Sequence, residues 1–226
     1  MKKYMAVIAT IISFVVAPLA SATVLTFDYN FEFSAGTPPA GLAPWLRATF
    51  DDGGGTGTVT LTLQELNLTG SEFVTEWDFN FDPNLNPASL TIVQNSGPTS
   101  ATPGKQTDHF KADGDGYFDI GFDFPSGPPA SRFKDGSTAV FTLTLSGITA
   151  NSFNFPSVNG VPGQGNFLSA AHVQGIGTGA DFSGWVAPDG GGQQQNGEAP
   201  EPGTLLLIGS GLIGLAGYGR KRFLKK

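Results

Sequence analysis

Residues 24–33 read Val-Leu-Thr-Phe-Asp-Tyr-Asn-Phe-Glu-Phe, and from Leu25 onward apolar and polar side chains alternate. Successive side chains of a β-strand point to opposite faces of its sheet. The alternation therefore places the leucine and the aromatic rings on one face, and the polar side chains on the other. The same period recurs at residues 58–63, 77–81, 118–124 and 140–145. This pattern predicts several strands that each have one buried face and one hydrated face.

Turn-forming residues separate the alternating segments. The chain contains 32 glycines and 16 prolines, with clusters such as Asp-Asp-Gly-Gly-Gly at residues 51–55 and Pro-Ser-Gly-Pro-Pro at residues 125–129. Helical periodicity is nearly absent. Many short strands between turns of this kind are typical of antiparallel sandwiches and jelly rolls. We therefore predict an all-β fold, an antiparallel β-sandwich or jelly-roll-like domain, over residues 23–188.

The first 22 residues have the three parts of a secretory signal peptide. Lys2 and Lys3 form a charged start, residues 5–16 are apolar, and Ala20 and Ala22 flank Ser21 as a small-residue cleavage site. We expect a signal-peptide helix over residues 1–22 that is cleaved after Ala22. The alternative is an uncleaved anchor, although the apolar stretch is short for a membrane span.

The residues after the predicted domain divide into a linker and a three-part end. Residues 189–199 are rich in Gly, Gln and Asn, which predicts a flexible linker. Residues 200–226 contain the polar motif Pro-Glu-Pro at 200–202, an uncharged apolar run at 203–219 and a basic tail at 220–226. The run of 17 residues is at the lower limit for crossing a bilayer core of about 30 Å. We predict a transmembrane helix there, with the basic tail in the cytoplasm and the domain outside.

This end resembles the PEP-CTERM sorting signal, which occurs on exported proteins of Gram-negative bacteria that make exopolysaccharide. The matching residues are Pro200, Glu201 and Pro202 of the motif, residues 205–219 of the span, and Arg220, Lys221 and Arg222 of the basic cluster. The resemblance implies handling by an exosortase, a membrane sorting enzyme. The protein would first be anchored facing the periplasm, and would then reach the cell surface or the extracellular matrix. The body is similar to uncharacterised exported domains that carry this signal.

The composition narrows the classes of partner and chemistry. Residues 23–199 contain five basic and 18 acidic side chains, a formal charge of −13. Such a surface repels nucleic acid and anionic lipid, so we expect no nucleic-acid partner and membrane attachment only through the C-terminal helix. The absence of cysteine excludes thiol catalysis, disulfides and iron–sulfur clusters. With two histidines in the chain, a zinc site would need carboxylate ligands.

One short motif has the composition of a calcium loop. Residues 113–119 read Asp-Gly-Asp-Gly-Tyr-Phe-Asp, and Asp113, Asp115 and Asp119 are candidate Ca²⁺ ligands. Ca²⁺ takes six to eight oxygens, which carboxylates and the carbonyls of a glycine-rich loop can supply. An EF-hand would need Gly at its sixth position and Glu at its twelfth, where this chain has Phe118 and Phe124. The alternative is a metal-free Asp-Gly turn that leads into a strand. We expect no other cofactor.

Two of the three tryptophans are candidate glycan-binding residues. Trp45 follows a proline and Trp185 follows a glycine, which favours partial exposure, whereas Trp77 lies in an alternating strand and is expected in the core. Flat aromatic faces can stack on sugar rings, although large aromatics more often pack in cores. A lectin-like module, with or without Ca²⁺, is therefore one alternative function.

The body contains no catalytic motif that the sequence distinguishes. Its 18 acidic residues make chance carboxylate pairs certain, and no nucleophile-elbow pattern accompanies His109 or His172. We therefore expect a non-enzymatic, exported surface or matrix protein associated with exopolysaccharide or biofilm. A glycan-active hydrolase is a further alternative.

Overall fold

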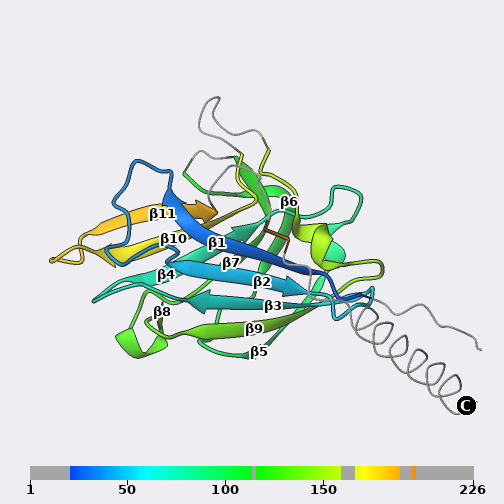
Figure 1. Cartoon of the computed structure of the whole chain (residues 1–226), viewed down its shortest axis with the longest axis horizontal. Coiled ribbons are helices and arrows are strands. Elements are labelled where there is room, and N and C mark those ends of the chain that lie inside the picture. The colour runs from blue at the N-terminus through cyan, green and yellow to red at the C-terminus, as the bar shows by residue number, and fades with distance from the viewer. Residues whose placement is uncertain (1–20, 114–115, 159–165, 189–194, 197–226) are drawn as a thin grey trace, which may run out of the picture. The chain divides into compact units, whose positions relative to one another are not determined.

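The computed structural model describes residues 21–113, 116–158, 166–188 and 195–196 (Figure 1). Nearly half of these residues form antiparallel strands, joined by turns and three short 3₁₀-helices. The strands are β1 (Val24–Glu32), β2 (Leu46–Asp51), β3 (Thr58–Glu65), β4 (Phe73–Phe79), β5 (Thr91–Ser96), β6 (Gly104–Lys111), β7 (Tyr117–Asp123), β8 (Phe133–Lys134), β9 (Thr138–Thr144), β10 (Ser169–Ile176), β11 (Phe182–Pro188) and β12 (Gln195–Asn196). The 3₁₀-helices are η1 (Pro87–Ser89), η2 (Pro129–Ser131) and η3 (Ala150–Phe153). The predicted all-β, antiparallel class is confirmed.

The ends of the chain lie largely outside the described residues. The predicted signal peptide except Ser21 and Ala22, the sorting motif, the apolar run and the basic tail are all outside them. Among the residues that the structure describes, no helix is long and apolar enough to cross a membrane. Within the predicted linker, β12 pairs with the start of β1, where Leu25 lies opposite Asn196.

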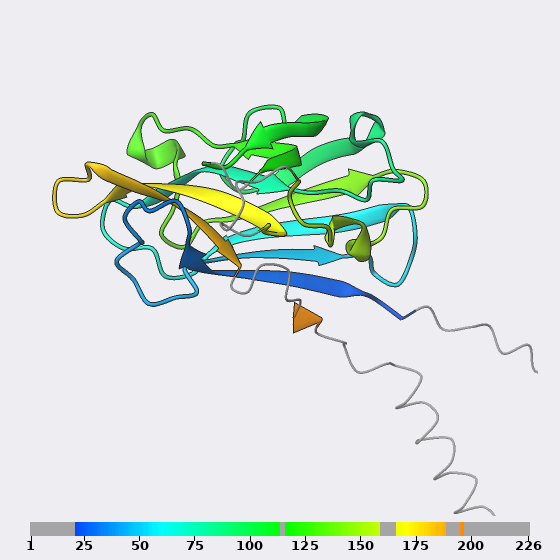
Figure 2. The same ribbon diagram turned by 90° about the horizontal axis from the view of Figure 1, so that it is seen from above.

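The strands form one continuous sheet in the order β5-β9-β3-β2-β1-β11-β10-β4-β7-β6, with β12 beside β1 and β8 beside β4. This sheet folds over on itself into two layers (Figure 2). Aromatic pairs join strands that are not neighbours in the sheet: Phe50 of β2 lies 5.2 Å from Phe79 of β4, and Phe122 of β7 lies 4.8 Å from Phe141 of β9. The layers therefore pack face to face around one core.

The continuity between the layers differs from the separate sheets of a simple sandwich. Strand β1 pairs with β2 from Val24 to Tyr29, and with β11 from Tyr29 to Glu32. Its register shifts between Tyr29 and Phe31, which marks a bulge or irregularity. Bulges bend a strand and increase its twist, so β1 passes from one layer into the other. The alternation predicted this strand, but it did not reveal that its two halves serve different layers.

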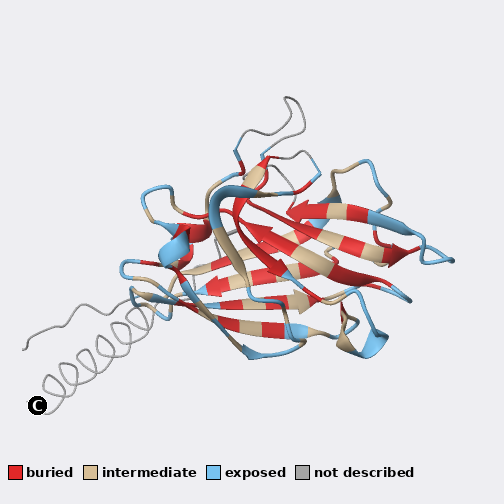
Figure 3. Ribbon diagram, turned by 180° about the vertical axis from the view of Figure 1, so that it is seen from behind, coloured by how far each residue is buried: buried red, intermediate tan, exposed pale blue. Residues whose placement is uncertain are grey.

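The core contains most of the apolar set of the alternating strands, as predicted, although Phe31 of β1 is 45% exposed. Leu25, Phe27 and Tyr29 of β1 are buried, while Thr26 and Asp28 between them are partly exposed. Figure 3 shows the same alternation as bands along neighbouring strands. Strands β4 and β7 depart from this alternation: Asp78 is fully buried between the core residues Trp77 and Phe79, and β7 is buried continuously from Phe118 to Phe122.

The burial of Asp78 has a tertiary cause. Its cross-strand neighbours are Ala170 on β10 and Gly121 on β7. Ala170 belongs to a second apolar cluster, whose members are Ala112, Phe118 and Ala170 with Phe33, Phe110 and Trp185 packed against them. The Phe110 ring lies so close over Gly121 that an added Cβ would meet it at 2.8 Å. This part of the outer face is therefore covered.

Asp52 ties the start of β1 to two distant segments. Its Oδ1 atom accepts hydrogen bonds from the backbone N–H groups of Thr23 at 2.8 Å and Gly54 at 3.0 Å. Its Oδ2 atom accepts one from Ala150 N at 3.3 Å, at the start of η3. If cleavage occurs after Ala22, the nitrogen of Thr23 becomes a charged terminal amine, and its bond to Asp52 becomes charge-assisted.

We predict that Asp52→Asn lowers the free energy of unfolding by about 1–3 kcal/mol, because buried N–H donors lose a charged acceptor. The loss should be larger in a chain that begins at Thr23 than in one that keeps its first 22 residues. Urea unfolding followed by tryptophan fluorescence measures both values. Asp51→Asn is the matched control, since Asp51 is exposed and accepts only from Gly53 N among the described residues. Equal losses for the two variants would contradict the role given to Asp52.

Candidate functional site

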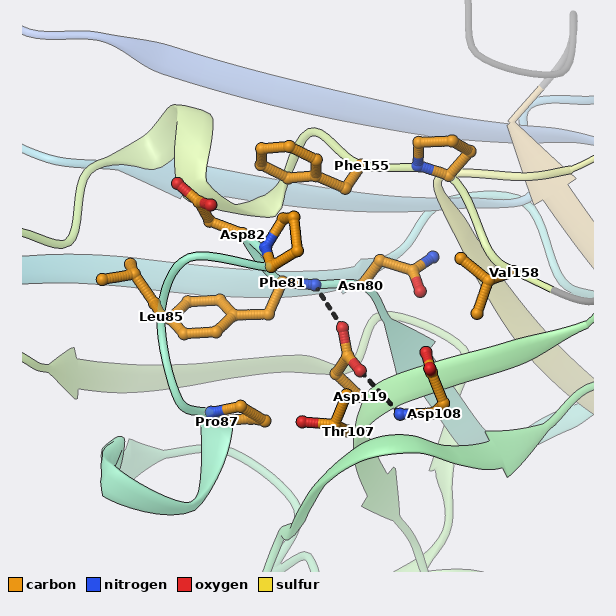
Figure 4. Close-up of a pocket in the computed structure, with 12 residues that line it drawn as sticks. Asn80, Phe81, Asp82, Leu85, Pro87, Thr107, Asp108, Asp119, Phe155 and Val158 are labelled. Atoms are coloured by element: carbon orange, nitrogen blue, oxygen red, sulfur yellow. Dashed lines mark hydrogen bonds between the residues drawn. The ribbon is translucent and has the colours of Figure 1, made fainter.

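A pocket of about 280 Å³ opens beside Asp119 of β7, where three further segments that are distant in the sequence meet. The segments are the loop between β4 and η1, the irregular middle of β6, and the chain after η3 (Figure 4). The lining residues are Asn80, Phe81, Asp82, Pro83, Leu85, Pro87, Thr107, Asp108, Asp119, Phe155, Pro156 and Val158. Its volume is close to the lower end of the range of small-molecule sites.

Asp119 holds two walls of the pocket together. Its Oδ2 atom accepts a hydrogen bond from Phe81 N and its Oδ1 atom accepts one from Asp108 N, both at 2.8 Å (Figure 4). Asp108 has a φ of +50° in the part of β6 where the register against β7 shifts between Lys105 and Phe110. Burial raises the pKa of Asp119, and the two N–H groups oppose this rise. Asp119 therefore shapes the pocket, and both of its oxygens already have backbone partners.

The remaining lining combines an apolar wall with a few polar groups. Phe81, Leu85 and Phe155 give the apolar surface, and Asp82 and Asp108 add carboxylates that are half-buried and exposed, respectively. The buried Asn80 donates its amide to the carbonyl of Phe167 at 3.4 Å. An aromatic surface beside hydrogen-bond acceptors suits a ligand that has both C–H faces and hydroxyl groups, as sugars have.

The predicted calcium ligands are only partly described. Asp115 lies outside the described residues, while Asp113 is exposed with a φ of +36°. Asp113 acts electrostatically on His172, whereas Asp119 binds the backbone at Phe81 and Asp108. Within the described part of the chain, no group of three His, Cys, Asp or Glu residues could hold a metal ion. Calcium binding stays a prediction, and Asp119 could serve it only by sharing oxygens that backbone N–H groups already occupy.

The two predicted glycan-binding tryptophans lie in different environments. Trp45 is only 7% exposed, belongs to the main core and donates its indole N–H to Gly41 O at 2.7 Å. Trp185 is half-buried on the outer face, where its ring stacks on His172 with 4.8 Å between ring centroids. Burial lowers the pKa of His172, and the charge of Asp113 opposes this effect. Neither tryptophan lines the pocket.

A row of acidic residues crosses the outer face of the sheet, and sequence reasoning did not identify it. Glu76 lies opposite Asp123 on β7 and opposite His172 on β10, and Asp78 lies two residues further along β4. Neither carboxylate oxygen of Asp78 has a hydrogen-bond partner among the described residues. The alternation around Trp77 predicted that Asp78 faces water. In the sequence, only the spacing of two residues between Glu76 and Asp78 indicated that the two acids lie on the same face of β4.

Burial is the main cause that raises the pKa values of two of these acids. The pKa of Asp78 lies well above its usual range because of burial, and the charges of Glu76 and Asp123 raise it further. Burial raises the pKa of Glu76 to about 7, and Asp123 adds to the rise. A pKa of about 7 leaves Glu76 partly protonated at neutral pH, and the raised pKa of Asp78 favours its neutral form.

Comparison with known proteins identifies the end of the chain. The model of the PEP-CTERM protein-sorting motif matches residues 198–222. The match contains Pro200, Glu201 and Pro202 as well as Arg220, Lys221 and Arg222, so the predicted sorting signal is confirmed. No curated protein and no solved structure matches the chain. The chain thus carries the PEP-CTERM sorting motif C-terminal to its all-β domain.

The acidic row makes the stability of the domain depend on pH. Because the folded-state pKa of Glu76 is about 7 against an ordinary value of 4.5, the folded state binds more protons than the unfolded state between these values. The contribution of Glu76 to the stability of the folded state is complete below pH 4.5 and is lost as the pH rises toward 7. We predict that the melting temperature falls over this window, and that Glu76→Gln makes the fall smaller.

Asp78→Asn should raise the melting temperature at pH 8 relative to the unmodified chain, because the raised pKa of Asp78 favours the unfolded state, in which the carboxyl group ionises, as the pH rises. Thermal unfolding followed by circular dichroism between pH 4.5 and 8 measures both effects. Asp135→Asn is the control, since Asp135 is exposed in the turn between β8 and β9. If Glu76→Gln and Asp135→Asn give the same pH profile, the acidic row does not control stability.

Proposed function

We propose that this PEP-CTERM protein is exported to the cell surface or extracellular matrix of an exopolysaccharide-producing bacterium, and that its β domain acts there by binding. The observation that carries this proposal is the sorting motif at residues 198–222. The motif implies an exported protein that is processed at the membrane by an exosortase-type enzyme. The final destination and the association with exopolysaccharide are inferences from this route.

The route requires two processing events at opposite ends of one folded domain. The signal peptide would be removed after Ala22, which frees the Thr23 nitrogen that bonds Asp52. The apolar run at residues 203–219 would hold the chain in the membrane, with the body outside, until the exosortase acts near Pro200. The predicted linker at residues 189–199 would give this enzyme access to the motif without unfolding of the domain.

Binding without catalysis is the simplest activity that the described side chains support. The carboxylate in the pocket that has a raised pKa, Asp119, accepts two backbone hydrogen bonds that fix the walls. A general acid or base needs a proton-transfer atom within reach of its substrate, and both oxygens of Asp119 point at backbone N–H groups. The buried Asp78 is covered by the second apolar cluster, which separates it from solvent.

We predict that the protein recovered from its native host begins at Thr23 and ends near Pro200. Intact-mass and terminal-peptide mass spectrometry would show both ends, and added hexose mass would indicate a matrix glycoprotein. Replacing Pro200, Glu201 and Pro202 by alanine should leave residues 220–226 attached. Alanines at Gln193 and Gln194 are the control and should not change the processing. An unmodified chain that still carries residues 220–226 would refute exosortase processing.

A second candidate function is glycan binding. The pocket is a better candidate site for a glycan than the two tryptophans that the sequence indicated. The apolar wall with Phe155 can take the C–H face of a sugar, and Asp82 and Asp108 can accept from its hydroxyl groups. Trp45 is buried in the core, whereas Trp185 is partly exposed. We therefore place the candidate glycan-binding site of the lectin-like alternative at the loops around η1 and η3, and not at the tryptophans.

We predict that Phe155→Ala weakens retention on the host exopolysaccharide about tenfold or more, since a lost aromatic contact costs on the order of 1.5 kcal/mol or more. Affinity electrophoresis with the purified polysaccharide measures the change. Phe182→Ala is the matched control, because Phe182 is 57% exposed on β11 and does not line the pocket. Trp185→Ala tests the original prediction in the same gel. Equal retention of the Phe155 and Phe182 variants would exclude this pocket.

A further inference from the structure

The main strand order of the continuous sheet ends at β5 and β6. Among the residues that the structure describes, β5 pairs with β9 alone and β6 pairs with β7 alone, so each presents one row of backbone N–H and C=O groups without a strand partner there. Such an edge can pair with a strand of another molecule, and natural proteins usually obstruct it with bulges, charges or proline. The two edges of this domain differ sharply in these protections.

The β6 edge is obstructed. Its register against β7 breaks between Lys105 and Phe110, and Asp108 within the break has a φ of +50°. It also carries charged side chains at Lys105, Asp108 and Lys111. An irregular, charged strand is a poor template for adding another strand.

The β5 edge has few of these protections. Residues 91–96 read Thr-Ile-Val-Gln-Asn-Ser, without charge, proline or glycine, and a register shift appears only near its end, between Gln94 and Ser96. Val93 is 53% exposed, and Thr91 and Asn95 beside it on the same face are also exposed. Segments of about six residues with strong strand preference and low charge are the usual templates for intermolecular pairing.

The outer face beside β5 is also uncharged. Thr91 lies in register with Thr144 on β9, and Thr144 lies in register with Thr58 on β3. Thr142 likewise lies between Val93 and Thr60. A basic group does meet the chain just before the strand, where Lys105 Nζ donates to Leu90 O. This neutral surface belongs to a body that has a formal charge of −13 over residues 23–199.

We propose that β5 pairs with β5 of a second copy of this chain and extends the sheet across two molecules. A two-fold interface places one surface patch against itself, so any net charge on the patch is repelled by its own copy. Most of the surface of this acidic body would be repelled by the same surface of a second copy, whereas the uncharged edge at residues 91–96 would not. Antiparallel pairing satisfies the open backbone groups of both strands at once.

The size of this contact sets its strength. Six residues on each side bury much less than the roughly 1,200 Å² of a stable complex, so the pairing is weak in dilute solution. It becomes populated where the chain is concentrated, for example when many copies are held on one surface. The inference does not depend on glycan binding, and its test below is independent of the polysaccharide.

The absence of cysteine makes disulfide trapping a direct test. Single substitutions Thr91→Cys, Val93→Cys and Asn95→Cys are placed in the full chain, expressed in the membrane of its host and exposed to a mild oxidant. Residues opposite each other in an antiparallel pair have Cα atoms about 4.5–5.5 Å apart, within the range for a disulfide. We expect a linked dimer at one of these positions, or between Thr91→Cys and Asn95→Cys chains mixed in one cell. Phe182→Cys is the exposed control on β11.

A charge variant separates specific pairing from random collision. Val93→Lys, added to the Asn95→Cys chain and to the mixed pair, should lower the yield of linked dimer about tenfold, because each copy then has a lysine on its pairing strand and the two positive charges repel each other. Val93→Thr should preserve the yield. Because Val93 is 53% exposed, we expect the lysine variant to keep the melting temperature of the unmodified chain. Measuring this temperature verifies that the variant folds. Linking at β5 that is no stronger than at Phe182→Cys, or that Val93→Lys does not reduce, overturns the proposal.

Discussion

The packing of aromatic rings between the two layers is the interaction on which the rest of the domain depends. Phe50 and Phe79 meet edge to face at 5.2 Å, and Tyr29 meets Trp77 in the same way at 5.0 Å. These contacts join strands that are far apart along the sheet, and the chain has no cysteine to cross-link them. Buried aromatic area and ring geometry must therefore hold the fold closed. This requirement explains why phenylalanine occupies so many inward positions.

Buried and half-buried carboxylates fix the loops around that core. Glu65 accepts from the backbone N–H groups of Leu68 and Gly136, and Glu72 accepts from those of Ala40 and Thr69. Asp119 does the same at the pocket. Part of the acidic composition is thus structural, since each of these groups satisfies donors in turns that no strand pairs. Asp78 differs, because it is buried without a hydrogen-bond partner among the described residues and is best accommodated as a neutral acid.

The sorting signal and the domain contribute to function in different ways. The signal at residues 198–222 directs the chain to an exosortase-type enzyme, whereas the domain has to provide whatever happens after export. Its distinctive surfaces are the pocket around Asp119 and the uncharged edge strand β5. A protein concentrated on a surface can use weak contacts of both kinds, because high local concentration compensates for low affinity. The acidic remainder of the surface keeps separate copies soluble.

The sequence by itself determined the strand class, the inward face of most strands and the sorting signal. These features are local, since a period of two or a motif in fixed order can be read from neighbouring residues. Only the tertiary structure decided that β1 serves both layers, that Trp45 lies in the core and that Asp78 is covered. The pocket likewise appears only when residues 80–87, 107–108 and 155–158 meet. Burial and proximity depend on which distant segments pack together, and strand alternation contains no information about that choice.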